Sequence, residues 1–151
     1  MEGLPVGATY SISLETCYDY AFSEIINVLL KAGVIWKTTV DGQKLYDYAE
    51  SSEVALDCLM SDQDSSVILR ELDNQFLAGQ SVAIFMSIND SYDITIVKYS
   101  KRELTIFFDF GRPLLTSTWM TDSSAIMKDI ITPLFTAGIC ILSVTTSDSN
   151  G

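Results

Sequence analysis

The chain has 151 residues, of which 48% are hydrophobic, and its 20 acidic and 9 basic side chains give a net charge of −11. A hydrophobic fraction of this size, with seven Phe and seven Tyr residues, excludes a disordered acidic tail, because such tails lack the apolar side chains that offset chain entropy. The negative field repels phosphate backbones and anionic membranes, so we expect neither nucleic acid nor a membrane as a partner.

The length predicts one domain, residues 1–151, which buries about 70% of its unfolded surface. Residues 1–8 carry no basic segment followed by an apolar run, and no stretch reaches the roughly 18 uninterrupted apolar residues of a spanning helix. We therefore expect a cytoplasmic protein. The cysteines Cys17, Cys58 and Cys140 are far apart in a chain without histidine, which predicts buried thiols and no metal site.

The first part of the chain predicts a strand, a helix and a hairpin. Residues 8–14 alternate between apolar and polar side chains, which is typical of a strand with one buried face. Thr16 is expected to cap a helix whose apolar residues recur at helical spacing until Gly33 ends it. Residues 34–40 are rich in β-branched and aromatic side chains and end at a turn, so residues 44–48 are expected to return as a short strand.

The middle of the chain predicts two helices and a three-stranded meander. A short amphipathic helix begins at Ser51 or Ser52, because apolar side chains recur on one side of the segment up to Leu59. A second helix covers residues 67–77. The connections between the next three strands are too short for crossovers, so these strands are expected to pair antiparallel. They cover residues 82–88, 92–99 and 104–110.

The last part of the chain predicts one more helix and one more strand. Thr121 or Asp122 caps the helix, and Pro133 kinks or ends it. The strand covers residues 139–145, and residues 147–151 are expected to form a disordered tail. The order of elements predicts an α+β fold, in which about three to four helices pack on a mainly antiparallel sheet of about five to seven strands.

The residue types limit the chemistry. Without histidine, Ser-His-Asp and Cys-His catalysis are excluded, and the glycines are scattered singly, so no phosphate-binding loop is present. Asp62 and Asp64 open a segment like a calcium loop, but Val67 occupies the position where the sharp turn needs glycine. We expect no enzyme, no cofactor and no metal site, although a carboxylate pair that hydrolyses glycosides stays open as an alternative.

The chain has one cationic cluster, which consists of Lys98, Lys101 and Arg102 beside Tyr99. The cluster falls at the predicted tip between two strands of the meander. Bases in such a position keep a protein soluble and protect the edge of a sheet, and we interpret the cluster in this way.

An acidic block at residues 47–64 contains six carboxylates and no Lys or Arg. Its central acids are spaced by three and four residues, which puts like charges on one helical face at a cost of roughly 0.2–0.5 kcal/mol per pair. An inert solvated face is the alternative interpretation, but such a face normally includes Lys. We predict that the block binds a basic partner through carboxylates and aromatic anchors. The predicted binding residues are Tyr46, Asp47, Tyr48, Glu50, Glu53, Asp57, Asp62 and Asp64.

A small, strongly acidic α+β protein without catalytic residues resembles, in size, charge and architecture, the immunity proteins that bacteria make against their own interbacterial toxins. The resemblance implies an inhibitor that occludes the basic active site of a cognate toxin, and it assigns no role to any individual residue. Two further alternatives are a DNA mimic that inhibits a nucleic-acid-binding enzyme and a structural adaptor that assembles through a sheet edge.

Overall fold

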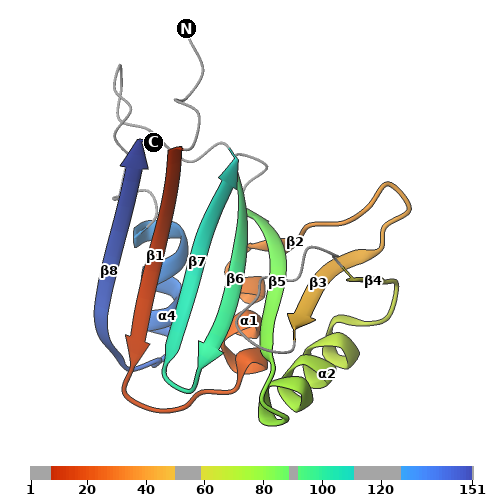
Figure 1. The fold of residues 1–151 in the computed structure, drawn as a ribbon, viewed down its shortest axis with the longest axis horizontal. Helices are drawn as coiled ribbons and strands as arrows, with labels where there is room; N and C mark the ends of the chain where they lie inside the picture. Colours follow the sequence, from red (N-terminus) through yellow and green to blue (C-terminus); the bar gives the residue numbers. More distant parts are fainter. Residues whose placement is uncertain (1–7, 50–58, 89–91, 111–126, 151) are drawn as a thin grey trace, which may run out of the picture.

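An antiparallel sheet of eight strands forms the frame of the fold (Figure 1). The computed structural model describes residues 8–49, 59–88, 92–110 and 127–150. The strands are β1 (Ala8–Thr16), β2 (Ile35–Trp36), β3 (Lys44–Ala49), β4 (Leu59–Ser61), β5 (Ser81–Ile88), β6 (Tyr92–Ser100), β7 (Glu103–Phe110) and β8 (Ile141–Asn150). The sheet order is β4-β3-β5-β6-β7-β1-β8, and β2 pairs with β5 outside this path. β4 and β8 are therefore the edge strands.

Helices cover one face of this sheet in the described part of the chain. They are α1 (Phe22–Lys31), α2 (Ser65–Leu77), the π-helical turn η1 (Met127–Ile131) and α4 (Thr132–Thr136). Figure 1 shows α1 and α4 behind the sheet, and α1 contacts both α2 and α4. The helix at the centre of this layer is thus α1.

The sheet has an apolar face because its long strands alternate between apolar and polar side chains. In β5 the apolar residues Val82, Ile84, Met86 and Ile88 are buried, and the residues between them are half-buried. Helices α1 and α2 contribute apolar stripes to the same core. These stripes consist of Phe22, Ile25, Ile26 and Leu29 in α1 and of Ile68, Leu69 and Leu72 in α2.

The α+β class with a mainly antiparallel sheet is confirmed. The predicted meander is also confirmed, because β5, β6 and β7 pair antiparallel in consecutive order. The sheet has eight strands, more than expected, because β4 forms where no strand was predicted. β2 covers two residues of the strand expected at 34–40, and a bridge between Thr38 and Lys44 continues the hairpin towards β3.

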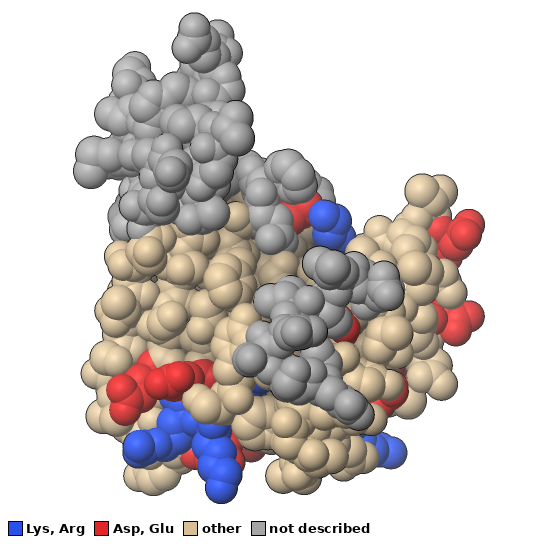
Figure 2. All heavy atoms as spheres, in the orientation of Figure 1, with Lys and Arg blue, Asp and Glu red and all other residues tan. Residues whose placement is uncertain are grey.

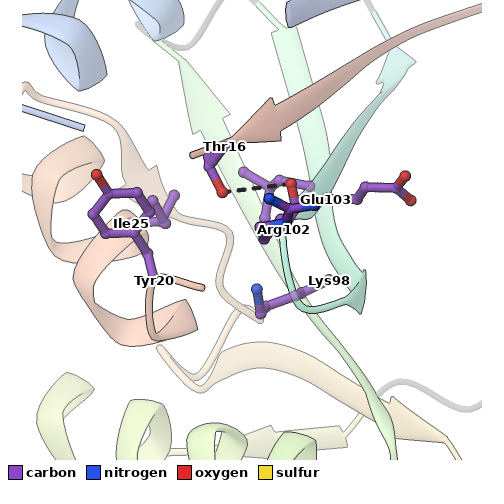
Figure 3. Close-up of a pocket in the computed structure, with 7 residues that line it drawn as sticks. Thr16, Tyr20, Ile25, Lys98, Arg102 and Glu103 are labelled. Carbon is purple, nitrogen blue, oxygen red and sulfur yellow. Dashed lines mark hydrogen bonds between the residues drawn. The ribbon is translucent and has the colours of Figure 1, made fainter. Parts of the chain in front are cut away.

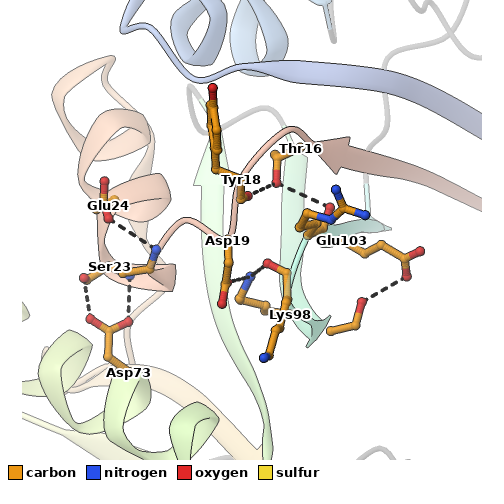
Figure 4. Close-up of polar contacts among 12 residues, drawn as sticks. Thr16, Tyr18, Asp19, Ser23, Glu24, Asp73, Lys98 and Glu103 are labelled. Carbon is orange, nitrogen blue, oxygen red and sulfur yellow. Dashed lines mark hydrogen bonds and ion pairs between the residues drawn. The ribbon is translucent and has the colours of Figure 1, made fainter.

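Helix α1 begins later than the sequence predicts, because its N-terminus is capped from another helix (Figure 4). The carboxylate of Asp73 in α2 accepts a hydrogen bond from the backbone N–H of Ser23 at 3.0 Å and another from the Ser23 hydroxyl. Thr16, the expected cap, ends β1 instead, and its hydroxyl donates to the carbonyl of Tyr18 at 2.7 Å. The cap is therefore a tertiary contact between α1 and α2.

The expected disordered tail is a paired strand as far as Asn150. β8 runs antiparallel to β1, and the register places Ala8 opposite Asn150 and Ser11 opposite Ser147. The local composition of this segment is that of a tail, but the full length of β1 offers it backbone partners. The prediction for residues 147–150 is therefore wrong, and residue 151 lies outside the described residues.

A disulfide joins Cys17, which follows β1, to Cys140, which precedes β8. Their Cα atoms are 5.4 Å apart, and the backbone N–H of Cys17 donates to the carbonyl of Cys140 at 2.9 Å. Cys17 is half-buried and Cys140 is exposed, so the expectation of buried thiols is wrong for both. The pairing of β1 with β8 brings together two cysteines that are 123 positions apart. Cys58 lies outside the described residues.

The disulfide should stabilise the fold because it reduces the conformational entropy of the unfolded chain. Because it closes a loop of more than a hundred residues, we expect its reduction to lower the free energy of unfolding by about 2–5 kcal/mol. Urea denaturation with and without reductant measures this difference. Cys58→Ser keeps both bonded cysteines and should still lose stability on reduction. A Cys17→Ser variant as stable as the oxidised protein would contradict the prediction.

The cap on α1 should contribute about 1 kcal/mol of stability. Asp73→Ala removes both acceptor oxygens and should lower the free energy of unfolding by about that amount, as measured by urea denaturation. Asp73→Asn keeps one acceptor oxygen, so we expect it to retain part of the stabilisation. Equal losses in the two variants would show that the charge of Asp73, and not its hydrogen bonds, matters.

Candidate functional site

The structure separates the predicted binding residues into buried and exposed groups. Asp62 and Asp64 are exposed in the segment between β4 and α2. Tyr46, Asp47 and Tyr48 lie in β3, where the first two are buried and Tyr48 is half-buried against the core. Glu50, Glu53 and Asp57 lie outside the described residues, as does most of the predicted helix that carries them. The end of that expected helix, Leu59, lies in the strand β4.

The two tyrosines face the helices and not the solvent. In the sheet register Tyr46 lies opposite Ile84 and Tyr48 opposite Val82, both of which are buried in the core. Tyr46 is 7% exposed. Burial raises the pKa of its hydroxyl, and the negative charge of Glu71 raises that pKa further. Tyr46 is thus a core residue, and the prediction that it contributes to an exposed binding surface is wrong.

Asp47 points to the other face of the sheet, where it lies opposite Ala83. It is 6% exposed. At this depth the side chain of Asp47 offers almost no surface to a partner. Asp47 therefore does not belong to an exposed binding surface in this conformation.

The exposed acids form a surface that we call the acidic rim, which consists of Val40, Asp41, Met60, Asp62 and Asp64. The register of β3 with β4 places Lys44 opposite Ser61, which brings the hairpin tip near residues 60–64. Figure 2 shows acidic side chains along the right-hand edge of the molecule, over this hairpin and β4. All three carboxylates of the rim are exposed.

Short-range contacts hold the acidic rim in place. The turn at the hairpin tip is closed by a hydrogen bond from the N–H of Gly42 to the carbonyl of Thr39 at 2.9 Å, and Gly42 has the positive φ of 82° that favours glycine. The ammonium of Lys44 donates to the carbonyl of Gln63 at 3.0 Å. The indole N–H of Trp36 donates to the hydroxyl of Ser65 at 3.2 Å, which ties the start of α2 to β2.

Apolar side chains are exposed between these acids. Val40 is fully exposed at 105%, and Met60 is 51% exposed on the edge strand β4. Protein interfaces combine an apolar centre with a polar or charged rim, and Met is enriched in them. The acidic rim has both components. The predicted binding residues did not include Asp41, although the Asp-Gly turn that exposes it is visible in the sequence.

The cationic cluster is in part structural. Lys98 is 5% exposed, and its ammonium contacts Asp19 at 3.3 Å and donates to the carbonyl of Lys101 at 2.6 Å (Figure 4). It also lies 4.8 Å from the centre of the Phe76 ring. The interpretation as a solubilising tip therefore fails for Lys98, which links β6 to the loop before α1, whereas Lys101 and Arg102 are exposed.

A small pocket lies beside Lys98 and is lined by Thr16, Tyr20, Ile25 and Arg102, among others (Figure 3). It has room for about one water molecule. The Lys98 ammonium already has a carboxylate and a carbonyl as partners, whereas Arg102 and Glu103 are exposed. At this size the pocket holds no ligand larger than water.

The described residues contain no group of three or more His, Cys, Asp or Glu side chains that could hold a metal ion. No helix among them is long and apolar enough to cross a membrane. Comparisons with protein-family models, with curated proteins and with solved structures find no match to this chain. The acidic rim is therefore the candidate functional site on physical grounds alone.

The ion pair between Lys98 and Asp19 predicts unequal losses of stability when one or the other residue is replaced. Asp19→Ala leaves a buried ammonium without its carboxylate and should lower the free energy of unfolding by about 1–3 kcal/mol. Lys98→Met removes the buried charge and keeps the apolar stem, so we expect a change within about 1 kcal/mol. Asp41→Ala, which removes an exposed acid, should stay within about 0.5 kcal/mol in the same urea titrations. A larger loss in Lys98→Met than in Asp19→Ala would contradict this account.

Proposed function

We propose that this protein is an acidic protein-binding module whose acidic rim contacts a basic surface on a partner protein. The observation that carries the proposal is that Asp41, Asp62 and Asp64 are exposed at the same edge of the sheet as the exposed Val40 and Met60. Acids that repel one another in the free protein gain most when a cationic surface arrives. The apolar side chains between them supply area that loses water on contact.

Charge gives this surface a long reach. The net charge of −11 attracts cationic partners and repels polyanions, and electrostatic steering raises association rates by orders of magnitude. Lys44 brings one positive charge to this edge, where its ammonium donates to the Gln63 carbonyl, so the rim carries three exposed carboxylates against one ammonium. A partner with a basic cleft fits this distribution best.

In biological terms the proposal is an immunity protein that inhibits a cognate bacterial toxin by occluding its basic active site. Support comes from the exposed acids and from the small α+β fold. Inhibition of this kind needs a charged edge that fits into a cleft, and an edge strand with a hairpin beside it has that shape. The inhibitor itself requires no catalytic group.

The disulfide bears on where this binding takes place. Disulfides persist in oxidising compartments and are rare in the cytosol, where thiols are kept reduced. The bond between Cys17 and Cys140 therefore argues against the cytoplasmic location expected from the sequence. We place the binding reaction in an oxidising compartment.

Coexpression with the protein encoded by the adjacent gene tests the proposal. The two proteins should copurify, and the association rate should fall as the salt concentration rises. Asp62→Lys should slow association by about tenfold or more at low salt, because it places a cation in the contact surface. The matched control is Glu103→Lys, which makes the same change in net charge at an exposed residue outside the acidic rim.

The control separates contact from general attraction. Glu103→Lys should slow association much less than Asp62→Lys does. Equal effects would show that the acids only attract the partner from a distance and that the contact lies elsewhere. An association rate that does not depend on salt would show that the interface is apolar, and the proposal would then fail.

A further inference from the structure

The outer side of β8 is a long edge at the opposite end of the sheet from the acidic rim (Figure 1). β8 has ten residues, and it pairs with β1 along its inner side. No described strand pairs with its outer side. Since half of the backbone N–H and C=O groups of a strand point to each side, the outer side presents a row of donors and acceptors.

This edge carries few of the features by which proteins usually prevent strand pairing, which are Pro, Lys, inward-pointing charges, bulges and short length. One irregularity is present at Leu142, where the register of β8 with β1 shifts between Glu15 and Thr16. β8 contains neither Pro nor Lys, and its one charged residue is Asp148. The other edge strand, β4, has three residues and lies among the carboxylates of the acidic rim. The two edges of the sheet therefore differ in how open they are to a further strand.

The segment that leads into β8 and forms most of it is free of charged residues, although the chain is strongly acidic. Residues 130–147 contain no Asp, Glu, Lys or Arg, although the whole chain has 29 charged residues, 20 acidic and 9 basic. A strand with basic side chains would find no opposite charge in this segment. A second copy of the same segment would meet no like charge in it, so two copies approach each other here with the least repulsion.

Apolar side chains are exposed along the same strand. Leu142 is 59% exposed and Val144 is 38% exposed, and Phe135 of the preceding helix α4 is 72% exposed. Four of the five residues at 143–147 carry a hydroxyl group. Hydroxyl side chains form favourable cross-strand pairs in antiparallel ladders. An identical strand that runs antiparallel offers the same side chains in return, as a two-fold interface requires.

We propose that two copies of this chain pair antiparallel through the outer sides of their β8 strands. The pairing joins two eight-stranded sheets into one continuous sheet and covers Leu142 and Val144 of each copy. Because β8 and β4 are at opposite ends of the sheet order, the dimer presents an acidic rim at each of its far ends. The proposal is independent of which partner the acidic rim binds.

The mass of the full-length protein in solution tests the pairing. Light scattering after size-exclusion chromatography should give twice the mass of one chain at micromolar concentrations. Val144→Lys and, separately, Thr145→Lys add a cation on each face of the edge, and each should raise the dissociation constant of the dimer by about tenfold or more. Two variants are needed because Val144 is partly packed, whereas Thr145 is exposed.

The matched control is Met60→Lys on the other edge strand, which makes the same change in net charge and should leave the dimer intact. Circular dichroism checks that each variant remains folded. A wild-type protein with the mass of one chain at these concentrations overturns the proposal. A dimer that persists in both β8 variants also overturns it, because the interface then lies elsewhere. Loss of partner binding in Met60→Lys with an intact dimer would separate this interface from the acidic rim.

Discussion

The position of β1 between β7 and β8 is the constraint on which the rest of the structure depends. Its register with β7 places Ser13 opposite Thr105, 92 positions later in the sequence, and its register with β8 reaches Asn150. Ordering a long stretch of chain before such a contact forms costs entropy, which rises slowly with the length of the loop. The Cys17–Cys140 disulfide makes this contact covalent at one end of the ladder. Figure 1 shows α4 behind the part of the sheet that these three strands form.

The same constraint positions the candidate site, although the site lies at the other end of the sheet. Once β7 is fixed by β1, the consecutive strands β6 and β5 follow in register, and β5 carries β3 and, through it, β4. The α2 helix packs against α1 and β5, and Trp36 anchors its first residue, Ser65. The acidic rim therefore lies on a rigid support, which favours binding because less conformational freedom is lost when a partner arrives.

Local patterns in the sequence predicted the parts of the fold that local physics determines. The alternation in β5, β6 and β7 and the apolar stripe of α2 gave the right elements at nearly the right boundaries. The errors lie where distant residues decide. Asp73 caps α1 from 50 positions away, and β1 converts an apparently disordered tail into a strand. For the site, the sequence identified Asp62 and Asp64 as exposed acids. The alternation of residues did not reveal that Tyr46 and Asp47, which lie on opposite faces of β3, are both buried.

The insertion of β1 between two later strands also has a consequence for synthesis. Ribosomes add roughly 5–20 residues per second, so β1 leaves the ribosome several seconds before β7 and β8 exist. During that interval its apolar residues Tyr10, Ile12 and Leu14, all buried in the finished protein, have no neighbouring strand in the nascent chain. The burial of β1 therefore waits for partner strands far along the chain, such as the one that places Thr105 opposite Ser13, 92 positions later.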